Sequence, residues 1–159
     1  MLPTVEVRSF KTADDALIVD GPARASSGTL ELARQSDLIV QPSGCGLDDL
    51  RPAVLLFHEL LAAGVGREKL VVALMRSAGE PEEGAARRYL QKAKYEPLVA
   101  SVPEHAGYRE AMNRGASLVE VADKRLIARA DAVIEELMKK VRAISAGRAM
   151  RSRKEQVTK

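Results

Sequence analysis

The sequence predicts an α/β fold, with a mostly parallel sheet covered by helices on both faces and a long C-terminal helix. Three observations favour this class. Short aliphatic runs alternate with longer segments of helical periodicity along the 159 residues. One run, Leu70 to Leu74, is apolar at every position, as in strands that are buried on both faces. Hydrophobic residues make up 46% of the chain but aromatic residues only 3%, so the expected core is aliphatic.

Five short runs rich in Val, Ile or Leu are typical of strands. These strands are expected at residues 5–10, 16–19, 37–40, 70–74 and 98–102. Pro42 and Gly44 are expected to stop the third strand, and Pro103 is expected to end the last one, because proline interrupts the hydrogen-bond ladder of a sheet.

Helical periodicity predicts helices at residues 29–35, 50–63, 81–94, 108–113 and 123–144. The second has apolar residues at helical spacing and is followed by Gly64. The third has acids in its first turn and bases toward its end, which matches the helix dipole. The last has an apolar stripe made of Ile127, Ala130, Ile134, Leu137 and Val141.

Composition excludes some classes of protein. No apolar run approaches the roughly 20 residues that a membrane span needs. The first residues resemble no secretory signal, and the single cysteine, Cys45, cannot form an internal disulfide. Two histidines and one cysteine, widely separated, give no spacing typical of a zinc site. We therefore expect a cytoplasmic protein without a membrane span.

Charge divides the chain into two parts. Residues 139–159 contain eight Lys/Arg and one acid, whereas residues 1–138 contain 17 Lys/Arg and 21 Asp/Glu. We accordingly predict an α/β domain at 1–138 and a basic helix end and tail at 139–159. Such a tail indicates contact with nucleic acid or an anionic surface. The alternative is a solvated, frayed end that aids solubility.

Four segments follow the predicted strands, and ligands of parallel sheets bind at the carboxyl ends of the strands. The segments are residues 20–24, 41–44, 75–77 and 103–105. The first includes an acid and a tight turn, Asp20-Gly21-Pro22, a pattern that presents an aspartate near nucleotide-bound magnesium. We expect any active surface to be assembled from these four segments.

In order, these segments resemble the C-terminal half of the ParA/MinD family of deviant Walker ATPases, especially its partition branch. The resemblance covers roughly residues 16–141. It is carried by the motifs Leu17-Ile18-Val19-Asp20-Gly21-Pro22, Asp37-Leu38-Ile39-Val40-Gln41-Pro42, Asp49-Leu50, Val71-Val72-Ala73-Leu74-Met75-Arg76 and Val102-Pro103-Glu104-His105-Ala106-Gly107-Tyr108. Met75 replaces the family's Asn, and His105 stands at its Arg position.

The resemblance implies a truncated fold of the P-loop NTPase type, because the family's phosphate-binding half has no counterpart here. The 159 residues contain no Gly-x-x-x-x-Gly-Lys-Ser/Thr. Family members bind ATP and Mg²⁺, form dimers and bind DNA non-specifically or engage a partner such as a ParB-like protein. For this chain the resemblance implies that ATP binds only when a separate P-loop half complements it. It implies no ATP hydrolysis by this chain alone.

Particular residues acquire expected roles from the resemblance. Asp20 corresponds to the catalytic acid that holds magnesium through water, and Met75 and Pro103 border the adenine. The alternatives are a turn-capping acid and, for Met75, ordinary core packing. Lys124, Arg125 and Arg129 fall where partition ATPases often contact DNA, and Arg125 and Arg129 share a helix face by their spacing. The alternative for these three residues is a solvated helix face. The tail residues Lys139, Lys140 and Arg142 are further DNA-binding candidates.

Other candidates favour ordinary structural roles. His58 lies in a helical pattern and His105 in a loop, and Ser43 lies in a Pro-Ser-Gly turn rather than a nucleophile elbow.

Three interpretations stay open. The chain is a partition or positioning protein that binds DNA or a protein partner, a fragment whose ATPase half lies on another segment, or a non-enzymatic nucleic-acid-binding module. Strands that lack their neighbours leave apolar surface exposed, so we also predict a homodimer or higher oligomer.

Overall fold

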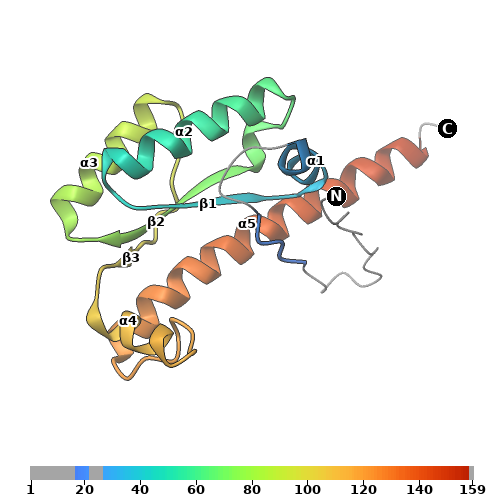
Figure 1. Ribbon diagram of the computed structural model, residues 1–159. Helices are drawn as coiled ribbons and strands as arrows, with labels where there is room; N and C mark the ends of the chain where they lie inside the picture. Colours follow the sequence, from blue (N-terminus) through green and yellow to red (C-terminus); the bar gives the residue numbers. More distant parts are fainter. Residues whose placement is uncertain (1–16, 22–26, 158–159) are drawn as a thin grey trace.

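The computed structural model describes residues 17–21 and 27–157 and has an α/β fold (Figure 1). A three-stranded sheet lies between two groups of helices, which confirms the predicted class. The elements in chain order are α1 (Ser27–Gln35), β1 (Ile39–Ser43), α2 (Leu47–Ala62), a 3₁₀ turn η1 (Arg67–Lys69), β2 (Leu70–Ser77), α3 (Glu80–Lys92), β3 (Val102–Pro103), α4 (Ala106–Asn113) and α5 (Lys124–Val157).

The sheet has the order β1-β2-β3, and both pairings are parallel. β1 runs beside β2 in unbroken register, from Ile39 opposite Leu70 to Ser43 opposite Leu74. β2 is the central strand, and its residues 70–74 are all buried. This confirms the strand that an unbroken apolar run predicts, because only a strand covered on both faces can bury every side chain.

Alternation along β2 divides the core into two layers. Val72 and Leu74 join the cluster formed with α2 and α3, which includes Phe57 and Leu90. Val71 and Ala73 point to the opposite face and join a second cluster with α4 and α5, the source of Leu126, Ala130 and Val133. The helices therefore cover both faces of β2, as the sequence predicts.

β1 continues through Pro42, so the prediction that this proline stops the strand is wrong. Within the described part of the sheet, β1 is an edge strand, where a missing backbone N–H is tolerated. The Pro42 carbonyl accepts a hydrogen bond from Gln41 Nε2 at 2.9 Å. Pro42 thus offers no donor to a further strand, and its acceptor is already occupied. Both features protect an edge from strand addition.

The prediction of a strand at 98–102 is mostly wrong, because residues 98–101 have no regular secondary structure and β3 covers only Val102 and Pro103. One isolated bridge joins Pro97 to Val72, and the Leu98 amide donates to the Val72 carbonyl at 2.8 Å. Side chains bind the following backbone groups instead. Arg87 donates to the carbonyls of Leu98 and Val99, both at 2.7 Å, and Glu136 accepts from the amides of Val99 and Ala100.

The expected strand at 16–19 is also absent where the structure describes it. Leu17, Ile18 and Val19 belong to no strand, and their side chains are 48%, 91% and 41% exposed. Nothing in the described sheet pairs with them, so the apolar composition that predicts a strand is not matched by burial. Ala16 and the expected strand at 5–10 lie outside the described residues.

α5 is longer than the sequence predicts, because it continues from residue 144 to Val157. A helix of 34 residues is about 51 Å long. Figure 1 shows α5 crossing beneath the sheet and extending past α1 toward the C-terminus. Its buried side chains are Leu126, Ala130 and Val133, whereas Ile134 from the predicted stripe is 49% exposed. Among the described helices, none combines the length and the apolar character that crossing a membrane requires.

Candidate functional site

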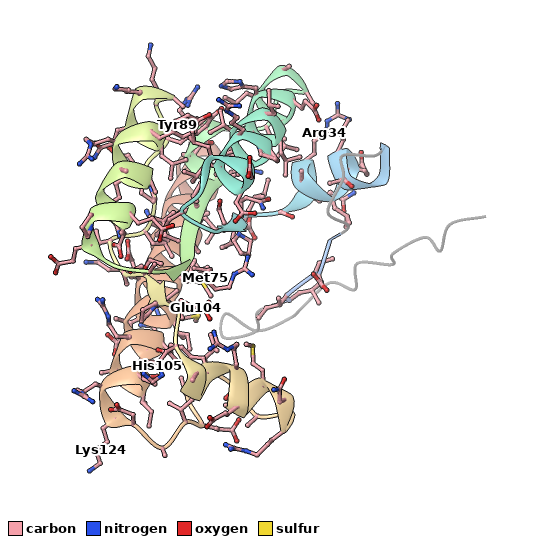
Figure 2. The ribbon with its side chains drawn as sticks, turned by 60° about the vertical axis from the view of Figure 1, so that its left-hand side comes forward. Arg34, Met75, Tyr89, Glu104, His105 and Lys124 are labelled. Carbon is pink, nitrogen blue, oxygen red and sulfur yellow. The ribbon has the colours of Figure 1, made fainter. Side chains whose placement is uncertain are left out.

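The three strands all end at one edge of the sheet, as the sequence predicts for a parallel arrangement. Ser77 of β2 lies opposite Pro103 of β3, and the Glu104 amide donates to the Ser77 carbonyl at 2.9 Å. Arg76 lies at a break in the register between β2 and β3 and has a φ of 55°. Figure 2 shows Met75, Glu104 and His105 in succession between the sheet and α4.

The predicted nucleotide residues are brought together only in part. Met75 lies opposite Val102, the residue before Pro103, so Met75 and Pro103 lie on adjacent strands. Both are partly buried, and Met75 packs against the α4 and α5 cluster, which is the core-packing alternative. Asp20 is exposed on segment 17–21, which has no regular secondary structure and lies outside the sheet.

Carboxylates dominate the helix N-termini at this edge. Asp48 and Asp49 are in the first turn of α2, and Glu80, Glu82 and Glu83 are in the first turn of α3. Glu82 accepts a hydrogen bond from the Ala78 amide at 2.7 Å. Acids stabilise a helix start, but they also repel the phosphates that a bare helix N-terminus attracts. Among the described residues, no group of three or more His, Cys, Asp or Glu side chains is suited to hold a metal ion.

Ser43 is the last residue of β1 and Cys45 lies two residues beyond it, and both are buried. The Ser43 hydroxyl donates to the Gly44 carbonyl at 2.9 Å, so it is occupied by its own turn. Burial raises the pKa of the Cys45 thiol, and the nearby Glu82 and Glu83 carboxylates raise it further. A buried, protonated thiol is a poor nucleophile. Neither residue has the environment of a catalytic group.

Glu83 and Arg87 form the best-connected ion pair at this edge, at 2.6 Å. The Ser101 hydroxyl donates to the second Glu83 oxygen at 2.7 Å. Burial alone raises the pKa of Glu83, but hydrogen bonds from Ser101 and Arg87 outweigh it and hold that pKa below its usual range. Because Arg87 also binds the carbonyls of segment 98–99, this pair joins α3 to the edge of the sheet.

The first group of basic residues on α5 is partly neutralised by neighbouring acids. Arg125 pairs with Asp123 at 2.9 Å, although its own side chain is 90% exposed. The Asp123 carboxylate raises the pKa of Arg125, and the Arg125 side chain lowers that of Asp123. Arg129 lines an open hollow of about 240 Å³ together with Glu80, Glu83, Gly84 and Arg87. Lys124 is exposed at the start of the helix (Figure 2).

The second basic group lies where α5 leaves the sheet. Lys139, Lys140 and Arg142 are all exposed, and within the described part of the chain no ion pair involves them. The helical backbone continues through four further basic residues, whose side chains lie outside the described residues: Arg148, Arg151, Arg153 and Lys154. Lys159 lies outside them as well. The backbone of this basic segment is helical as far as Val157.

The two histidines have structural partners. His105 is the N-cap of α4, where its Nδ1 accepts from the Gly107 amide at 3.1 Å. The ring centroids of His58 and Tyr95 are 5.7 Å apart. The Tyr108 hydroxyl donates to the Leu126 carbonyl at 2.6 Å and ties α4 to α5. These contacts agree with the structural roles that the sequence favours for the histidines.

Sequence reasoning missed Glu136, which fixes the backbone of segment 99–100 from α5. It also missed Arg87, although the i, i+4 spacing of Glu83 and Arg87 was a readable signal. No such local signal exists for Glu136, because its partners lie 36 and 37 residues away.

Comparison with known proteins yields neither a family whose pattern matches this chain nor a matching curated protein.

Proposed function

We propose that this chain is a ParA-like positioning protein that binds the phosphate backbone of DNA through α5 and does not hydrolyse ATP by itself. The observation that carries the proposal is the continuous basic half of α5. Residues 139–157 contain seven Lys/Arg and one acid, all within one helix. A helix holds its charges at fixed spacing, so several side chains reach phosphates at a smaller entropic cost than in a disordered tail.

The charge of the rest of the chain supports DNA binding at the basic half of α5 and not at the α/β domain. The net negative charge of residues 1–138 and the acids at the carboxyl edge repel a polyanion. DNA is then attracted to the basic half of α5 and held away from the body. Lys124, Arg125 and Arg129 are retained in this proposal as secondary contacts, because acids compete for two of them.

In this proposal the chain binds nucleotide only when a separate P-loop half complements it. ATP and Mg²⁺ require phosphate-binding amides, and the sequence contains no P-loop to provide them. The neighbouring positions of Met75 and Pro103 are the observation that favours a remnant adenine-bordering surface. In a complemented ATPase, Asp20 would supply the magnesium-associated acid. This second candidate predicts nucleotide binding only after a P-loop half is added.

The proposed protein is cytoplasmic, forms a homodimer or higher oligomer, and engages a ParB-like or other protein partner. The oligomer is supported by Val40 of the edge strand β1, an apolar side chain that is 37% exposed.

An anisotropy titration of the full chain with two unrelated labelled duplexes tests DNA binding. Both duplexes should bind with similar affinity, and the affinity should fall by about 100-fold or more between about 50 and 200 mM salt. A chain that binds neither duplex at the lower salt contradicts the proposal, and a strong preference for one sequence contradicts backbone binding. Calorimetry with ATP–Mg²⁺ should give no binding heat for the isolated chain.

A further inference from the structure

We propose that two copies of this chain pair through α5, with the two helices antiparallel and centred near residue 136. The contact surface is an outer stripe of α5, made of Ile127, Ile134, Met138 and Val141. This inference rests on the homodimer in the proposed function and specifies its interface. It does not depend on DNA binding.

The outer stripe is apolar and incompletely covered. Ile134 is 49% exposed and Met138 is 39% exposed, and the other two members are only partly buried. Their spacings of seven, four and three residues place the four side chains on one side of the helix. This side is next to the stripe that packs under the sheet, which contains Leu126, Ala130 and Val133. α5 therefore has a wider apolar surface than the sheet covers.

The sheet leaves a matching surface beside this stripe. Val40 and Pro42 of β1 lie opposite Val71 and Ala73, whose side chains join the α4 and α5 cluster. Val40 and Pro42 thus point to the α5 side of the sheet, yet both are exposed. Neither residue belongs to the cluster that packs β2 against α4 and α5. Helices pack about 8–10 Å apart, so a second helix beside α5 would reach the uncovered side of β1.

Charge on the flank of the outer stripe favours a second copy of α5 as the occupant. Asp131 and Glu135 lie on this flank before the centre, and Arg142 lies on it after the centre. All three side chains are exposed. An antiparallel pair centred near residue 136 brings Asp131 of each copy close to Arg142 of the other, and Ile134 close to the partner's Met138. A parallel pair would oppose like charges instead.

Pairing of two β1 edges is the competing geometry, and the structure disfavours it. Pro42 lacks an N–H, and its carbonyl already accepts from Gln41 Nε2 at 2.9 Å. Two such edges cannot form a regular ladder at this position.

The first test is the mass of the full chain in solution without DNA, by light scattering over a dilution series. The unaltered chain should be a dimer, and the double substitution Ile134→Glu with Met138→Glu should give a folded monomer. The matched control is Leu55→Glu, because Leu55 is a 60% exposed apolar residue on α2. It should leave the dimer intact. A monomeric unaltered chain, or a dimeric double variant with unchanged circular dichroism, overturns the proposal.

A charge exchange tests the antiparallel direction. Asp131→Arg and Arg142→Asp should each raise the dimer dissociation constant by about tenfold, and the combination should restore it. A combination as weak as the sum of the single changes overturns the antiparallel arrangement. Because mass is measured without DNA, a dimer that binds no DNA contradicts the DNA-binding proposal alone. A monomer that still binds DNA contradicts the homodimer and its interface but leaves the DNA-binding proposal intact, whereas a dimeric double variant contradicts the interface alone.

Discussion

The two halves of α5 have the same secondary structure but different surroundings. In the docked half, residues 124–137, three side chains are buried under the sheet and Glu136 binds two backbone amides. In the outer half, residues 138–157, the described basic side chains are exposed. Many residues of the outer half are Ala, Arg, Lys or Met, whose high helix propensity favours the helix where the sheet makes no contact with it. Docking therefore stabilises the fold through the first half, whereas the outer half is free to bind a partner.

Leu126→Ala should have the largest effect on stability, because it removes a 7% exposed side chain from the cluster between the sheet and α5. We expect a loss of about 2–4 kcal/mol in the free energy of unfolding. The matched control is Ile144→Ala in the outer half, where partial exposure predicts a loss below about 1 kcal/mol. Urea unfolding measures both values. Equal losses would show that the two halves are equally packed.

Glu83→Gln should cause the next largest loss of stability, because it removes the carboxylate that Arg87 and Ser101 bind. Both side chains of the Glu83–Arg87 pair are less than one quarter exposed. We expect a loss of about 1.5–3 kcal/mol, typical of hydrogen bonds to charged groups. Glu80→Gln is the control, since Glu80 is exposed in the same helical turn. A control variant that loses as much stability would contradict a specific role for Glu83.

The same network predicts an acid-sensitive fold. The folded chain holds the pKa of Glu83 below its usual range, so this group stabilises the fold fully above its unfolded pKa near 4.5. That contribution is lost as the pH falls through the lowered folded pKa. The unaltered chain should therefore lose more stability than Glu83→Gln between about pH 5 and pH 3. Parallel stability curves for the two proteins would contradict this assignment.

Glu136→Gln should have a smaller effect. One carboxylate oxygen accepts from the Val99 amide at 3.0 Å and the other from the Ala100 amide at 2.9 Å. Glutamine keeps one acceptor but brings an NH₂ group to the other amide, so we expect a loss of about 1–2 kcal/mol. Glu135→Gln, on the exposed side of α5, serves as the control. Hydrogen exchange should speed up at Val99 and Ala100 only in the Glu136 variant.

Much of the fold was predictable because its signals are local. The apolar run at 70–74, the helical spacing at 50–63 and the acids that begin α3 all act within a few residues. Pro42 misled the prediction because a proline is tolerated on an edge strand, and edge position is a property of the whole sheet. Segment 98–102 misled it because Arg87 and Glu136 bind backbone groups that a neighbouring strand normally binds.

The candidate site was less predictable. Sequence order was enough to bring Met75 and Pro103 to adjacent strands, because parallel strands end at one edge. It gave no information on Asp20, since the apolar residues before it make no strand pairing in the described chain. The exposed basic residues on α5 were readable from composition. That these residues lie on one uninterrupted helix depends on the summed helix propensity of many residues. The apolar stripe ends at Val141, so by itself it predicts a helix that is too short.

The smallest effect on stability is expected for the double substitution Lys139→Ala and Lys140→Ala, which leaves Arg142 of the proposed dimer contact unchanged. These side chains are exposed, so the free energy of unfolding should change by less than about 0.5 kcal/mol. A matched control removes two exposed positive charges from α3, through Arg88→Ala and Lys92→Ala. Both variants change the net charge by the same amount.

The most direct test of DNA binding through the outer half of α5 is the slope of log affinity against log salt, measured on one duplex. The double α5 variant should have a slope smaller by about 2 than the unaltered chain, because two phosphate contacts are lost. The matched control should keep a slope close to that of the unaltered chain. Identical slopes for the unaltered chain and the α5 variant, or an equal reduction in the control, would contradict DNA binding through the outer half of α5.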